Sequence, residues 1–88
     1  MTIGDEHIVA RIFELLDRRA AGATICPSDA ARSLAIDEAA WRALMPEVRR
    51  VAAALAAAGR LRVTAHGQEV DALQARGPIR LGRPISRG

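Results

Sequence analysis

The sequence predicts an α+β domain in which three helices precede a β hairpin. Two observations support this prediction. The chain has 88 residues, 50% of them hydrophobic, which is enough for one small core but not for two. Apolar residues recur at three- and four-residue steps up to Gly59 and at two-residue steps after it, and this change of period marks the passage from helix to strand. We therefore expect a single domain over residues 1–88.

The first helix is expected over residues 5–21. Ile8, Ile12 and Leu16 recur at helical spacing and give the segment a wide apolar face. Acidic residues stand in its first turn and arginines near its end, which is the arrangement that the helix dipole favours. The segment therefore has both the face and the charged ends of an amphipathic helix.

A second, shorter helix is expected over residues 27–35. Pro27 suits the first helical position, and Asp29 can face the exposed amides of that turn. Cys26 would then be the N-cap, although a serine or threonine bonds better there, and Ser28 is the alternative cap.

The third helical region covers residues 38–59, with Asp37 as its cap and Gly59 as its stop. Pro46 lies inside it, and an internal proline removes one hydrogen bond and clashes with the preceding turn. We therefore expect a break or kink near Met45, which leaves open one bent helix or two.

Two strands are expected over residues 61–65 and 78–82, because apolar and polar residues alternate in both. They should pair antiparallel and pack on the helices, since an isolated two-stranded hairpin is unstable. The turn residues His66-Gly67-Gln68-Glu69 follow the first strand. Residues 83–88 form a tail that we expect to be frayed.

Three helices followed by a two-stranded antiparallel wing is the order of a winged helix-turn-helix domain. Several segments of the chain also resemble the family known as domain of unknown function 3253. These segments are residues 41–49, 61–71 and 75–81. The Ala-Arg-Gly-Pro-Ile-Arg block at 75–80 is the most specific of them, whereas Cys26 stands where a serine or threonine would be more usual. The resemblance implies a small bacterial winged-helix-like domain and no activity, because the family has no agreed one.

Catalytic and metal-binding residues are not evident in the sequence. A reactive cysteine needs a base within hydrogen-bond reach, and the two histidines, His7 and His66, lie in the first helix and at the hairpin tip, away from Cys26. One cysteine and two distant histidines do not have the paired spacing of a zinc site. We expect no enzyme, no cofactor, no metal and no small-molecule substrate.

Nucleic acid is the first candidate partner. In DNA-binding winged helices the last helix enters the major groove and the wing touches the backbone. Arg49 and Arg50, near the start of that helix's second half, would be groove contacts, and Arg62, Arg80 and His66 would be backbone contacts from the wing. The partner would be double-stranded DNA.

Composition weakens this interpretation. All basic residues are arginine, the net charge is only +3, and alanine is abundant, which together suggest compositional bias. The alternative is a protein-interaction module, since the outward alanines Ala53, Ala54 and Ala57 would permit close approach of a second copy or of another protein. The single cysteine and the lack of a long apolar run indicate a cytoplasmic domain that does not enter a membrane.

Overall fold

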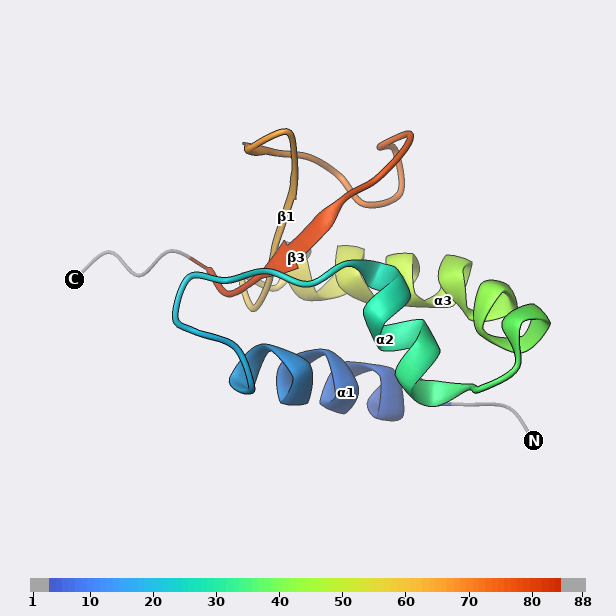
Figure 1. Cartoon of the computed structure of the whole chain (residues 1–88). Coiled ribbons are helices and arrows are strands. Elements are labelled where there is room, and N and C mark those ends of the chain that lie inside the picture. Colours follow the sequence, from blue (N-terminus) through green and yellow to red (C-terminus); the bar gives the residue numbers. More distant parts are fainter. Residues whose placement is uncertain (1–3, 85–88) are drawn as a thin grey trace.

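A computed structural model describes residues 4–84 of the chain. It shows an α+β domain of three helices and a three-stranded antiparallel sheet (Figure 1). The helices are α1 (Asp5–Asp17), α2 (Pro27–Leu34) and α3 (Glu38–Ala57), and the strands are β1 (Arg62–Ala65), β2 (Gln68–Glu69) and β3 (Arg80–Gly82). In Figure 1, α2 crosses between α1 and α3, and the strands extend over the C-terminal part of α3.

Helix α1 ends at Asp17, four residues before the predicted boundary at residue 21. Its last turn tightens, because the amides of Arg18 and Arg19 donate to carbonyls three residues back, at 3.3 and 3.1 Å. The residues that follow, Ala20 to Gly22, are exposed and have no apolar surface to bury. The helix therefore ends where its apolar face ends, even though the alanines that follow favour helix.

Helix α3 is continuous through Pro46, so of the two outcomes left open, one bent helix or two helices, the chain does not form two. Pro46 is exposed, and the turns on both sides of it bury apolar residues, among them Leu44 and Val48. Burial on both sides stabilises more than the lost hydrogen bond costs. The cap at Asp37 is confirmed, since its side chain accepts from the Ala40 amide at 3.1 Å.

The end of α3 matches its predicted stop. Gly59 has φ +75°, a left-handed conformation that costs glycine little and other residues more. The chain then leaves the helix, and the amide of Arg60 donates to the Leu55 carbonyl at 2.9 Å. The change of apolar period at this glycine therefore coincides with the observed passage to β structure.

The sheet has three strands in the order β2-β1-β3, so the expectation of two strands is corrected. The short strand β2 forms because the turn at His66 and Gly67 folds the chain straight back, pairing Thr64 with Glu69. The predicted antiparallel pairing of the two longer strands is confirmed, with Val63 opposite Leu81. Strand β3 begins at Arg80, two residues later than expected, and an additional bridge joins Leu81 to Ile25.

The core lies between the helices and one face of the sheet. Its side chains come from all three helices, and the strand residues expected there are all buried: Leu61, Val63, Ile79 and Leu81. Trp41 is only half-buried at the edge of the core, where the guanidinium groups of Arg32 and Arg42 lie 5.7 and 5.2 Å from its ring centre.

The predicted tail falls mostly outside the described residues, which end at Pro84. Of its two described members, Arg83 donates a hydrogen bond to Asp17 of α1 and lies over the ring of Phe13. The start of this segment is therefore held against α1.

Candidate functional site

Arg49 points to the loop between β2 and β3 rather than to open solvent. Its guanidinium donates to the carbonyl oxygen of Gly77 at 2.7 Å and to that of Ala75 at 3.3 Å. Because both acceptors belong to this loop, Arg49 ties the loop to α3. Its role as a groove contact stays a prediction.

Arg50 lies on the neighbouring edge of α3 and forms ion pairs. It donates to both oxygens of Asp5 on α1, at 2.7 and 3.0 Å, and to Glu47 at 2.7 Å. The hydrogen bond from Arg50 lowers the pKa of Asp5, and the bonds to Asp5 and Glu47 raise the pKa of Arg50. Two carboxylates therefore surround this guanidinium.

The outward face of α3 carries no net charge. Its exposed charged residues are two acids and two arginines, and each acid pairs with an arginine one turn away: Glu38 with Arg42 and Glu47 with Arg50. The other exposed positions of α3 are Ala39, Ala40, Ala43, Pro46, Ala54 and Ala57. This face therefore offers small apolar groups and balanced charge.

Arg62 and Arg80 share the sheet face that points away from the core. The register places Arg80 opposite Thr64 on β1, two residues from Arg62, while the alternate residues Val63 and Leu81 point inward. The side chain of Arg80 binds the segment before α2. It donates hydrogen bonds to Oγ1 and the carbonyl oxygen of Thr24 and contacts Sγ of Cys26.

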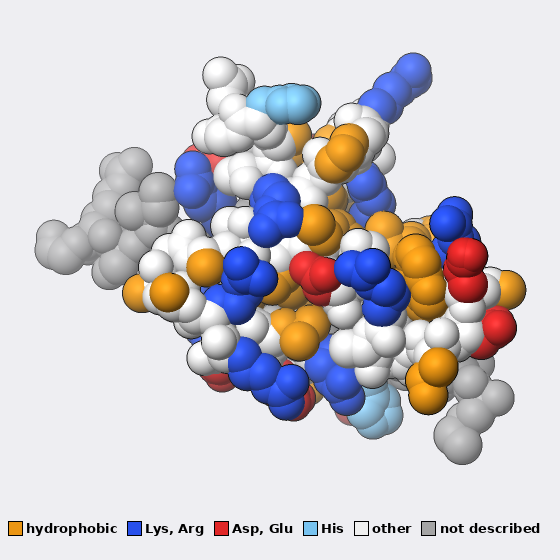
Figure 2. Space-filling view, in the orientation of Figure 1, with side chains coloured by type: hydrophobic (Ala, Val, Ile, Leu, Met, Phe, Trp, Pro, Cys, Tyr) orange, Lys and Arg blue, Asp and Glu red, His pale blue; other side chains and the backbone are white. Residues whose placement is uncertain are grey.

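His66 is exposed at the β1–β2 turn, where it adopts a left-handed φ of 52°. The five residues predicted to contact DNA therefore lie in four places: Arg49 on the loop side of α3, Arg50 on its α1 side, Arg62 and Arg80 on the outer sheet face, and His66 at the hairpin tip. On the face shown in Figure 2, the basic side chains are scattered, and several lie beside acidic side chains.

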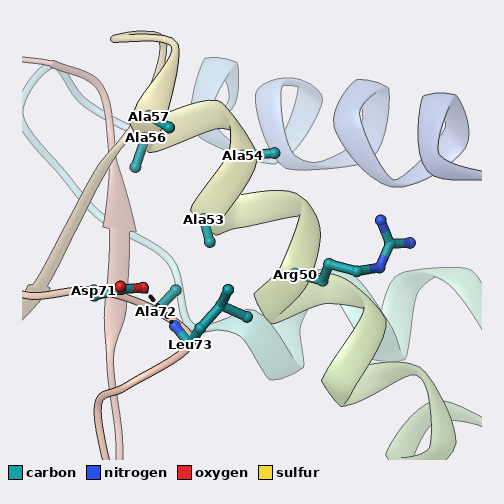
Figure 3. Close-up of a pocket in the computed structure, with 8 residues that line it drawn as sticks. All are labelled: Arg50, Ala53, Ala54, Ala56, Ala57, Asp71, Ala72 and Leu73. Carbon is teal, nitrogen blue, oxygen red and sulfur yellow. Dashed lines mark hydrogen bonds between the residues drawn. The ribbon is translucent and has the colours of Figure 1, made fainter.

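A shallow groove of about 600 Å³ runs between α3 and residues 71–73. Figure 3 shows Ala53 and Ala56 on its helix side and Leu73 across from them, while Arg50 extends away toward α1. The Asp71 carboxylate accepts from the Leu73 amide at 2.8 Å and fixes the turn that presents Leu73. The Leu73 side chain is 63% exposed, although it is a large apolar group.

Sequence reasoning missed Leu73, because it lies in the irregular segment after β2 where no period identifies a face. It did identify three of the groove's alanines, Ala53, Ala54 and Ala57, as outward residues of the last helix. The groove is apolar and lined by no nucleophile, and the described residues contain no group of three potential metal ligands. Its chemistry is that of contact with another apolar surface.

The fold and these contacts define a small α+β domain whose last helix and following loop are fastened together by an arginine. The chain belongs to the family described as "Protein of unknown function (DUF3253)", which matches residues 5–84. No curated protein matches the chain. Within residues 4–84, no helix has the length and apolar character needed to cross a membrane.

Proposed function

We propose that this chain is a winged-helix module that binds protein, and that its partner is a second copy of itself. The winged-helix assignment is supported by the element order, in which α2 and α3 are joined by only three residues, 35–37, and the sheet follows. Ile25 adds the short bridge before α2 that completes the sheet edge. The wing is then formed by β1, β3 and the chain between them. The single cysteine fits a reducing compartment such as the bacterial cytoplasm.

The observation that carries the proposal is the exposed Leu73 beside an alanine-lined groove. An exposed apolar side chain that is contiguous with other apolar surface is typical of a protein interaction site, whereas a single isolated one is common on any surface. Elsewhere on the described chain, Ile36 is the other large hydrophobic residue that is strongly exposed, and it lines no part of the groove. Leu73 and the groove therefore form a projection and a hollow of matching chemistry on one face.

A second copy fits this face because the face is self-complementary. A two-fold interface brings the same patch of each copy together, so that a projection on one meets the hollow on the other. Leu73 of each chain would occupy the alanine groove of its partner. Glu47 and Arg50 add an acid and a base on one helix face, which can pair across a two-fold axis as well as within a chain. A typical interface covers about 800 Å² per partner, roughly one seventh of the 5879 Å² surface.

The proposal is tested by sedimentation velocity over a range of protein concentrations. The unmodified chain is expected to show a species of twice the monomer mass, and Leu73→Asp is expected to abolish it, because a buried carboxylate would lack a partner. Ile36→Asp is the matched control: it removes the other exposed apolar side chain and should leave association unchanged. A monomer at all concentrations, or equal loss in both variants, contradicts the proposal.

Double-stranded DNA remains a second candidate, and one observation favours it. Several arginines of the described chain form no ion pair: Arg19, Arg49, Arg60, Arg62, Arg76 and Arg80. A DNA binder that engages about four phosphates would show a log–log salt slope near −3.6 with random duplex. Replacing Arg49 and Arg50 together by Gln should then weaken binding. No binding at low salt excludes this candidate.

A further inference from the structure

We propose that the outer face of the sheet holds a binding site for a phosphate group, in a hollow bordered by Thr24, Arg62 and Arg83. The hollow has a volume of about 160 Å³. Water occupies about 30 Å³ per molecule in the liquid, so the space takes roughly five waters or one small oxyanion. This site lies on a different surface from the α3 groove, and it does not depend on self-association.

The hollow exists because a glycine stands where a side chain would fill it. The bridge between Ile25 and Leu81 places Thr24 opposite Gly82, and the β1–β3 register places Arg62 on the other side of Gly82. Gly82 needs no left-handed φ, but a Cβ there would lie 3.0 Å from Cγ2 of Thr24. Glycine therefore leaves open a space between a threonine and an arginine on one sheet face.

Arg62 supplies the observation that points to an anion. Its Nε is shielded from solvent and has no hydrogen-bond partner within residues 4–84. None of the ion pairs of the described chain includes Arg62. A buried N–H of a charged group is costly when it lacks an acceptor, and an oxyanion in the hollow would bring several acceptors to this guanidinium.

The other lining groups can donate to the same ligand. Arg83 pairs with Asp17, but a guanidinium has five N–H donors, so it can serve Asp17 and a ligand together. Oγ1 of Thr24 already accepts from Nε of Arg80 at 2.8 Å, which leaves its own proton to donate. Thr64 lines the hollow as well. Two arginines and a hydroxyl from three segments line the space, and each has a donor that a phosphate oxygen can accept.

Two acids lie beside residues that line the hollow. Asp17 is occupied by Arg83, and Glu69 of β2 is exposed on the row that contains Thr64. Arg62, Arg80 and Arg83 therefore outnumber the carboxylates around the hollow. The positive excess favours a doubly charged ligand over a singly charged one.

The test is a titration of the full chain with inorganic phosphate at constant ionic strength, followed by the NMR signal of the Arg62 Nε–H. We expect a saturable shift of this signal, with a smaller response to acetate, and a parallel titration with glycerol phosphate separates free phosphate from a phosphomonoester. Arg62→Gln and Gly82→Ala should each weaken binding about tenfold or more, because one removes the charge and the other fills the space.

Arg76→Gln is the control for general charge effects, since Arg76 is exposed and lies outside the hollow. It should bind phosphate as the unmodified chain does. Amide spectra of each variant establish that it is folded. A linear, unsaturable response of the unmodified chain, or the same loss in Arg76→Gln as in Arg62→Gln, overturns the proposal.

Discussion

Arg49 and Gly77 are joined by a hydrogen bond of 2.7 Å that connects α3 to a loop 28 residues further along the chain. Gly77 adopts φ +83°, and the loop turns there toward β3. The second bond of Arg49, to the Ala75 carbonyl, means that one side chain satisfies two carbonyls of an irregular segment. The loop that presents Leu73 is therefore fixed to the helix on which the groove is built.

Replacing Arg49 by Met should release this loop. The methionine keeps the apolar stem but loses both hydrogen bonds, and a bond to a charged group contributes about 1.5–3 kcal/mol. We expect urea unfolding to show a loss of this order, with faster hydrogen exchange at residues 71–77. Arg76→Met in the same loop is the control and should change neither quantity, because the structure gives the Arg76 side chain no bond to lose. Equal effects of the two variants would show that Arg49 has no special role.

The Asp5–Arg50 pair makes stability depend on pH. The pKa of Asp5 is lowered in the folded chain, so its contribution is complete above the ordinary carboxyl pKa of about 3.9 and is lost as pH falls through the lowered value. Asp5→Asn should therefore lower the melting temperature at about pH 7 and have no effect near pH 2. Glu6→Gln, at a neighbouring acid outside any ion pair, is the control. A difference between the unmodified chain and Asp5→Asn that does not change with pH would refute this assignment.

Much of the fold could be predicted, because the spacing of apolar residues along the chain indicates which positions face the core. Ile8, Ile12 and Leu16 at helical spacing, and Val63 and Leu81 at strand parity, are all buried as their positions require. Element ends were less accessible to prediction. The local chemistry of Pro46 predicts a break in the helix. The helix stays intact because apolar residues on both sides of Pro46 are buried, and this burial depends on partners distant in sequence.

Pro46→Ala should stabilise the chain, because it restores an amide donor inside a continuous helix. An internal proline costs about 3 kcal/mol relative to alanine, and we expect a gain of about 1–3 kcal/mol, since the native helix has already adjusted to the ring. Thermal unfolding measures it as a higher midpoint. An unchanged or lower midpoint would mean that the proline fits its place without strain.

Burial of Ile12 can be compared directly with exposure of Ile36. Ile12 is fully buried in the core, whereas Ile36 is 101% exposed in the turn before α3. Ile12→Ala should cost about 2–5 kcal/mol, because it leaves a cavity, and Ile36→Ala should change stability by less than about 0.5 kcal/mol. Denaturant unfolding of both variants measures the two costs. A large effect at Ile36 would place it in an interface or in the core instead.

The candidate site was less predictable than the fold. Strand parity correctly placed Arg62 and Arg80 on one sheet face, because alternation is a local property. The long-range contacts of Arg49 and Arg50 could not be foreseen, since Gly77 and Asp5 are 28 and 45 residues away, whereas the pairing of Arg50 with Glu47 is local. Charge and helix position identify an arginine as exposed, but they do not reveal which carboxylate or carbonyl the fold brings to it.

The most direct test of the central proposal is a series of amide NMR spectra of the unmodified chain at rising concentration. From about 20 µM to about 1 mM, a range that covers weak self-association, signals from residues 47–57 and 71–74 should move together toward a plateau while those of α1 stay in place. Spectra that do not change with concentration, combined with movement of the α3 signals on addition of random duplex DNA, would contradict self-association and favour nucleic-acid binding.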